Sequence, residues 1–186
     1  VTSIGDYAFT FCDNLEWILF NSDNPPIINI DCFDEETILY VKDGFVTRYQ
    51  EDLSFQFLTN TITTKSVNVK LYVDNTIYKT ITEKYYSNLD GFSNPTKTGY
   101  DFLYWLDSNG NMQKTGYIFK YYEDINLYAY FEKSKYTINL DNGDCTETIT
   151  ITYGEQVNLT IPNEDGYSFL GWYDSEIGGN LIIDSS

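Results

Sequence analysis

The sequence carries the same pattern twice, at a fixed distance of 67 residues. The segments 99–105 and 166–172 both read Gly-Tyr-x-Phe-Leu-x-Trp, and the same offset pairs Pro95 with Pro162 upstream. A segment repeated in this way is one supersecondary unit, whose side chains fill its own interior and that of its neighbours. We therefore expect a series of modules in place of a single globule.

Each copy opens with a strand in which apolar and polar residues alternate. The apolar residues are Val69, Leu71 and Val73 in the first copy, and Tyr136, Ile138 and Leu140 in the second. A polar turn follows at Asp74-Asn75 or at Asn142-Gly143, and Asn-Gly favours a tight hairpin. Thr82 stands where the second copy has Ile149 in its return strand. The hairpin register is therefore expected to differ between the copies.

Further strands are predicted in the rest of each copy. The Phe-Leu-x-Trp run buries its aromatic rings against the sheet, Asn109-Gly110 signals a second hairpin, and Leu127–Phe131 supplies a closing strand. The second copy reaches only the counterpart of Phe119, because Ser186 is the last residue of the chain. We expect it to lack an edge, to be incompletely packed, or to borrow a strand from a neighbouring molecule.

These motifs resemble the internalin B repeat, also called the Listeria-Bacteroides repeat. The signature of that family is a Gly-Tyr-x-Phe-x-Gly-Trp core and a terminal Leu-Tyr-Ala-x-Trp. The second copy has Gly171 as the family does, whereas the first has Tyr104 there and Phe131 in place of the terminal Trp. The resemblance covers about residues 67–186. It implies compact, β-grasp-like modules in tandem on secreted or wall-anchored proteins, with no catalytic residues.

A different pattern occupies the N-terminal third. It is Ile-Gly-x-x-Ala-Phe-x-x-Cys-x-x-Leu-x-x-Ile, carried by Ile4, Gly5, Ala8, Phe9, Cys12, Leu15 and Ile18. This resembles one BspA-type leucine-rich repeat, and Ile28, Cys32 and Phe33 form a degenerate copy 24 residues later. After Asp43, apolar residues at helical spacing resemble the capping helix that ends such a solenoid.

The expected fold class is mainly β and multi-module. We place the C-terminal end of a leucine-rich-repeat solenoid with a short capping helix at 1–62, a first internalin B-type β repeat at 67–133, and a second, incomplete one at 134–186. A Thr- and Asn-rich segment at 59–66 predicts the linker. The net charges of 1–66, 67–133 and 134–186 are −8, −1 and −8, so the first β repeat repels an anionic partner least.

Composition limits the chemistry that this chain can perform. Its 11 basic and 28 acidic residues give a net charge of −17, which disfavours nucleic acid and anionic lipid. No stretch approaches the ~20 apolar residues that cross a bilayer, so no membrane insertion is expected. The sequence has no histidine, which excludes Ser-His-Asp and Cys-His catalysis. We expect no enzyme, cofactor or metal site.

Because Val1 opens directly into a structured pattern, we expect a piece excised from a longer protein.

Three acidic or sulfur-bearing features each have a simpler interpretation than a metal or catalytic site. The segments 107–111 and 141–144 resemble calcium loops, but hairpin turns need the same residues for conformational reasons. Asp34-Glu35-Glu36 suggests a carboxylate pair, although adjacent residues seldom converge on one bond. The three cysteines, Cys12, Cys32 and Cys145, are too few and scattered for a zinc site, and we interpret them as buried apolar residues.

Aromatic residues are the remaining candidates for binding, since exposed rings stack on sugars and anchor protein partners. The chain has 18 tyrosines, and the pairs Tyr85-Tyr86 and Tyr121-Tyr122 would each expose one ring if they lay in strands. The candidate interaction residues are Trp17, Tyr85 and Tyr121. The alternative is that tyrosine serves only as a strand former. Trp105 and Trp172, inside the repeated signature, are expected to be packing residues.

We therefore predict a non-catalytic extracellular portion of a bacterial cell-surface or secreted protein. It would combine an adhesion or protein-interaction surface with spacer repeats, and its partner would be a protein or glycan on host or neighbouring cells. The alternative is a carbohydrate-binding accessory module of a larger secreted enzyme, which exposed aromatics would permit. A hydrolase that uses only acidic residues is a third and weaker interpretation, since the repeats predict no cleft.

Overall fold

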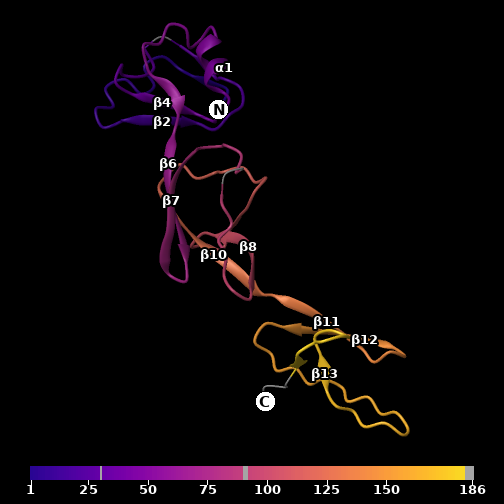
Figure 1. Ribbon diagram of the computed structural model, residues 1–186. Helices are drawn as coiled ribbons and strands as arrows, with labels where there is room; N and C mark the ends of the chain where they lie inside the picture. Colours follow the sequence, from indigo (N-terminus) through magenta and orange to yellow (C-terminus); the bar gives the residue numbers. More distant parts are fainter. Residues whose placement is uncertain (30, 90–91, 183–186) are drawn as a thin grey trace. The chain divides into compact units, whose positions relative to one another are not determined.

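The computed structural model describes residues 1–29, 31–89 and 92–182, and almost all of its regular structure is β-strand (Figure 1). Residues 1–95 and 104–130 form one compact unit, and residues 96–103 and 131–186 form another. Within the described residues, no helix is long and apolar enough to cross a membrane. The domain boundaries inferred from the sequence stay predictions.

Successive N-terminal segments stack in parallel. β1 (Ser3–Ile4) pairs with β3 (Ile27–Ile28), and Ile4 lies opposite Ile28. The rings of Phe9 and Phe33 stack with centroids 5.6 Å apart. Both contacts join residues 24 positions apart. Residues at matching positions of the two N-terminal segments therefore lie next to each other in space.

A second parallel sheet continues this stacking. It contains β2 (Trp17–Phe20), β4 (Ile38–Val41) and β5 (Ile62–Thr64), in the order β2-β4-β5. The predicted linker at 59–66 thus contains a strand, although its sequence shows little apolar periodicity. The Asn60 amide also donates to the carbonyl oxygen of Thr37 at 2.9 Å, which fixes the chain just before β5.

Helix α1 (Val46–Glu51) lies where the capping helix was predicted. Its Tyr49 is fully buried and donates its hydroxyl to the Ser22 carbonyl oxygen at 2.9 Å. Burial raises the pKa of Tyr49 to about 12. Around it lies an apolar core that the parallel strands share with the helix: Phe20, Ile28, Cys32, Phe33, Leu39, Val41 and Phe55.

The first repeat is a five-stranded sheet in the order β7-β6-β10-β8-β9. Figure 1 labels four of these strands, β6, β7, β8 and β10. Its strands are β6 (Ser66–Val73), β7 (Thr76–Lys84), β8 (Tyr100–Leu106), β9 (Met112–Gln113) and β10 (Ile125–Lys133). β10 contains the predicted closing strand and runs parallel to β6, with Leu127 opposite Leu71. The predicted hairpin at Asn109-Gly110 joins β8 to β9.

The second repeat begins with a hairpin of β11 (Lys135–Asp141) and β12 (Thr146–Thr152), and later has the short pair β13 (Trp172–Tyr173) and β14 (Leu181–Ile182). The tight turn is not at Asn142-Gly143, where four residues separate the strands, but at Asp74-Asn75 in the first repeat, where both residues have positive φ.

The hairpin registers differ, as predicted. Val69 pairs with Ile81, whereas its counterpart Tyr136 pairs with Ile151, three positions further along the repeat. The shorter turn of the first hairpin and a bulge between Leu71 and Tyr72 account for the shift. The bulge lets an apolar residue oppose Val69 despite the polar residues at the matching positions.

The expectation that all three cysteines are buried is wrong for two of them. Cys32 is fully buried, and burial raises the pKa of its thiol. Cys12 and Cys145 are exposed and free. Cys145 lies in the open turn between β11 and β12, whose residues are all exposed.

Gly99, in the C-terminal compact unit, is held against a tyrosine. An added Cβ at Gly99 would overlap the ring of Tyr153, and φ there is +75°. Its carbonyl oxygen accepts the Ser134 amide at 2.9 Å, and the Ser134 carbonyl oxygen accepts the Tyr153 amide at the same distance. Glycine is therefore required here both for the backbone conformation and for this close approach.

We expect Gly99→Ala to destabilise this contact by about 2 kcal/mol, because it combines left-handed strain with a steric clash. Gly166→Ala is the matched control, since Gly166 occupies the same signature position at φ +85° with open space around it. Hydrogen exchange of residues 131–136, read by mass spectrometry, should speed up only in Gly99→Ala. Equal effects of the two substitutions would show that backbone strain alone matters.

Candidate interaction surface

Four tyrosines form two stacked pairs on the sheet of the first repeat. The rings of Tyr72 and Tyr128 stack at a centroid distance of 5.2 Å, and those of Tyr104 and Tyr130 at 4.9 Å with an interplanar angle of 4°. Tyr128 and Tyr130 are 38% and 40% exposed. We call these four residues the tyrosine face.

Strand alternation places them on the solvent side. In β6, Val69 and Leu71 are fully buried, so Tyr72 points to the opposite side of the sheet. In β10, Leu127 is fully buried and its neighbour Tyr128 is exposed. Tyr72 lies directly opposite Tyr128 in the parallel ladder, which brings the two rings together.

Polar groups border the tyrosine face. Asp124 accepts the Asn68 backbone amide at 2.9 Å and its side-chain amide at 3.1 Å. These hydrogen bonds, backbone first, lower the pKa of Asp124. Exposed Lys70 lies on β6 between Asn68 and Tyr72. The surface thus offers ring edges, hydroxyl groups, an amide and one cation.

The second repeat does not reproduce the tyrosine face. At the 67-residue offset, Asn139 stands in the place of Tyr72 and Gly171 in the place of Tyr104. The shared signature therefore does not need these rings for packing. Tyr72 and Tyr104 can therefore take part in a binding contact that is specific to the first repeat.

Trp17 begins β2 and is half-buried. Its ring meets Tyr40 edge-on at 5.9 Å, and the Lys65 ammonium lies 3.9 Å from its centroid. Neighbours within the same unit thus cover much of this predicted interaction residue. Its role in binding stays a prediction.

Tyr85 and Tyr121 do not lie in strands, contrary to the arrangement considered from the sequence. Tyr85 is 4% exposed and donates its hydroxyl to Asn21 Oδ1 at 2.7 Å, and burial raises its pKa. Tyr121 donates to Asp107 Oδ2 at 2.8 Å, and burial together with this bond raises its pKa. Their role in binding stays a prediction, while the structure gives both a packing role.

Asp107 closes the β8–β9 hairpin with a full set of donors. Oδ1 accepts the backbone amides of Asn109 and Asn111, each at 2.8 Å. Oδ2 accepts the Asn111 side-chain amide and the Tyr121 hydroxyl, also at 2.8 Å. An ionised carboxylate has about four lone-pair sites, and all four are filled. This arrangement supports the turn interpretation of segment 107–111 over a calcium loop.

The second repeat has a similar aspartate–asparagine pair, which a comparison at the 67-residue offset does not reveal. Asp174, the counterpart of Asp107, accepts the Asn180 backbone amide at 2.7 Å and its side-chain amide at 3.0 Å. These bonds, the side-chain one first, lower the pKa of Asp174. Because this loop is two residues longer, Asn180 does not align with Asn111, and comparison at one offset misses the pair.

The tyrosine face could have been found from the sequence by strand alternation. The strand Leu127–Phe131 contains Tyr128 and Tyr130 at a spacing of two, and buried Leu71 implies that Tyr72 faces outward. What alternation cannot supply is the pairing of β10 with both β6 and β8, which stacks the rings.

The chain matches known proteins through its repeats. The Listeria-Bacteroides repeat domain matches residues 72–130 and 136–186. Internalin H of Listeria monocytogenes is 38% identical over 88 residues, covering 46% of the chain and 16% of that protein. A protein of Evansella cellulosilytica described as a putative membrane protein is 33% identical over 87 residues, covering 45% of the chain and 13% of its own length.

The matches agree with the internal repeat found in the sequence. Both family segments contain one copy of the Gly-Tyr-x-Phe-Leu-x-Trp signature, and together they span more than half of the chain. The chain covers less than a fifth of either relative's own length. It belongs to the Listeria-Bacteroides repeat family.

Proposed function

We propose that this chain is a non-catalytic, extracellular portion of a bacterial cell-surface or secreted protein, in which the tyrosine face contacts a protein or glycan on host or neighbouring cells. The observation that carries this proposal is that exposed Tyr128 and Tyr130 stack on half-buried Tyr72 and Tyr104 on the less charged repeat. Tyrosine supplies a large contact area with only two side-chain torsions to order, so it suits binding surfaces.

The remaining modules would present and space this surface. Residues 1–62 would be the end of a BspA-type leucine-rich-repeat solenoid, capped by α1. The parallel pairing of Ile4 with Ile28 and of Trp17 with Ile38 supports this, since each joins segments 21–24 residues apart. The β repeats would be grasp-like modules, and internalin H supports a surface location by its similarity.

A carbohydrate-binding accessory role is the alternative. Cross-strand stacking uses one face of each tyrosine ring, and Tyr128 and Tyr130 keep 38% and 40% of their surface exposed. Sugars stack on such faces and accept hydrogen bonds from neighbouring amides and hydroxyls. The Asn68 and Lys70 side chains beside the rings would suit this chemistry.

A double variant tests the proposal. We expect Tyr128→Ser with Tyr130→Ser to reduce binding of the labelled full chain to cells or to an array of glycans and surface proteins by at least about tenfold, because rings at hot spots dominate binding energy. Loss of a glycan signal alone would favour the accessory role, and loss of a protein signal the adhesion role.

Tyr117→Ser is the control, because Tyr117 is exposed to the same 38% as Tyr128 but lies outside the tyrosine face. It should bind as the unchanged chain does. Circular dichroism should show the same β content for all variants. Unchanged binding by the folded double variant would refute the assignment of the contact to these rings.

A further inference from the structure

The turn between β11 and β12 holds an Asn-Gly pair, Asn142-Gly143, and residues 141–145 are all exposed. The counterpart turn Asp74-Asn75 is exposed in the first repeat as well, so exposure is a property of the turn itself. At an Asn-Gly pair, the backbone nitrogen of glycine can attack the side-chain carbonyl carbon of asparagine, since no Cβ hinders the approach. The contacts of the turn decide how readily this attack occurs.

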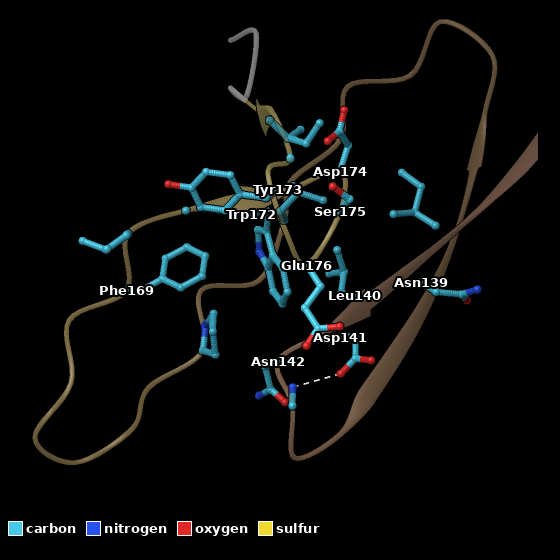
Figure 2. A pocket seen from close by; sticks show the side chains of 18 of the residues that line it. Asn139, Leu140, Asp141, Asn142, Phe169, Trp172, Tyr173, Asp174, Ser175 and Glu176 are labelled. Carbon is cyan, nitrogen blue, oxygen red and sulfur yellow. Dashed lines mark hydrogen bonds between the residues drawn. The ribbon is translucent and has the colours of Figure 1, made fainter.

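The attacking atom, the Gly143 nitrogen, lies in contact with a base. It donates its hydrogen to Asp141 Oδ1 at 2.9 Å, the bond drawn as a dashed line in Figure 2. Asp141 is the last residue of β11 and pairs with Thr146 of β12, which holds its backbone in place. A carboxylate in this position can take the proton of the amide as the new bond forms.

The carbonyl group that would be attacked is held by two donors. Asn142 Oδ1 accepts the backbone amides of Asp144 at 3.1 Å and of Cys145 at 2.9 Å. Negative charge collects on this oxygen when a nucleophile adds to Asn142 Cγ. Two amides that already point at the oxygen stabilise that charge, as the donors of an oxyanion hole do.

The space around the glycine is open. Gly143 has φ +90°, and no heavy atom lies within 4 Å of the place where a Cβ would be. Since the whole turn is exposed, water also reaches the reacting atoms. The turn therefore brings together a nucleophile, a base and a polarised carbonyl group, with room for a ring to close.

A second Asn-Gly pair, Asn109-Gly110, provides a comparison within the same chain. It is exposed too, and Gly110 has a similar φ of +83°. The Gly110 nitrogen, however, donates to the backbone carbonyl oxygen of Asp107 at 3.1 Å, and a carbonyl oxygen is a much weaker base than a carboxylate. The two pairs thus differ in the group that accepts the glycine N–H.

We propose that Asn142 is a site of self-modification, at which the chain converts asparagine to aspartate or isoaspartate through a succinimide. The Gly143 nitrogen bonds to Asn142 Cγ, and its proton passes to the Asp141 carboxylate. The bond from Cγ to Nδ2 then breaks, and Nδ2 takes up the proton and leaves as ammonia. Water adds to either carbonyl carbon of the succinimide ring, and the ring C–N bond at that carbon breaks.

The modification changes both the charge and the shape of the turn. Either product adds a negative charge to residues 134–186, whose net charge is already −8. Isoaspartate also routes the main chain through the former side chain, which lengthens the turn and removes the arrangement that Asn142 Oδ1 holds together. The second repeat would therefore become more acidic with time, and more repellent to an acidic partner.

Peptide mass spectrometry of the full chain during incubation at neutral pH tests the proposal. We expect succinimide, aspartate and isoaspartate to form at Asn142 at least about tenfold faster than at Asn109, because only Gly143 has a carboxylate base. In the chain unfolded by urea, both pairs lose their contacts and should react at similar rates. A folded chain in which the two asparagines also react alike would overturn the proposal.

Two variants separate the base from the charge of the turn. Asp141→Ser keeps an oxygen acceptor near Gly143 but cannot take the proton at neutral pH, so it should slow the reaction of Asn142 by at least about tenfold. Asp144→Ser removes the same charge from the same turn and keeps the backbone amide that contacts Asn142, so it should react as the unchanged chain does. An unchanged rate in Asp141→Ser, or an equal loss in both variants, would overturn the role of Asp141. Circular dichroism should show the same β content for all three chains.

Discussion

Trp105→Ala should lower the free energy of unfolding of the first repeat by about 3–5 kcal/mol, which is the usual cost of deleting a large buried ring. Trp105 has no exposed surface, and Tyr78 covers its ring at a centroid distance of 6.1 Å.

Trp172→Ala is the internal control for this experiment. It deletes the same side chain from the same signature position, but Trp172 is only half-buried. We expect a loss of about 1 kcal/mol, in proportion to the smaller area removed from contact.

Hydrogen exchange in the full chain measures both effects, since the amides of β6 and of β11 report on local opening of each repeat. Circular dichroism during urea unfolding provides an independent value. Equal losses for the two tryptophan variants would show that Trp172 is as well packed as Trp105, and would contradict the difference in their burial.

The contrast between these tryptophans shows how far a repeated motif predicts structure. Equal sequence signatures predicted equal packing roles, and for Trp105 this is confirmed. Trp172 differs because burial depends on a strand that the second repeat does not have among its described residues. The motif specifies which side chain points inward, and distant pairing decides what covers it.

The pairing of strands far apart in sequence also limited the prediction of sites. Tyr85 was a candidate because a Tyr-Tyr pair in a strand exposes one ring, yet Tyr85 lies outside the strands and donates its hydroxyl hydrogen bond to Asn21, 64 positions away. Alternation along the strand places Tyr128 and Tyr130 on one face, but it does not show which other rings they meet. Only their position between β6 and β8 makes them a stacked surface.

Local turn chemistry was predicted with partial success. Asn109-Gly110 does form a hairpin, but Asn142-Gly143 lies in a wider turn than its sequence favours. Side-chain acceptors decide such cases, since Asn142 Oδ1 accepts the backbone amides of Asp144 and Cys145 and so holds the wider loop.

Asp107→Ala should destabilise the β8–β9 hairpin by about 3 kcal/mol, because it leaves four donors without their acceptor. Asp107 is only 5% exposed, so water cannot readily replace the carboxylate. Asp174→Ala removes the counterpart in the second repeat, where the carboxylate is exposed and water can take over its role. We expect that variant to change stability little.

The same carboxylate gives the stability a defined pH dependence. Burial by itself would raise the pKa of Asp107, but hydrogen bonds from Asn111, Tyr121 and Asn109 outweigh it and hold the pKa below its usual range. The unfolded chain then binds this proton at higher pH than the folded chain does. Stability from Asp107 is therefore fully present above the unfolded pKa of about 3.9, and is lost as pH falls through the lower folded value.

Urea unfolding followed by circular dichroism at a series of pH values below about 5 measures this loss. Asp107→Asn keeps the size of the side chain but cannot titrate, so its unfolding midpoint should fall less steeply with acid than that of the unchanged chain. Parallel pH profiles for the two proteins would mean that Asp107 is not preferentially ionised by folding.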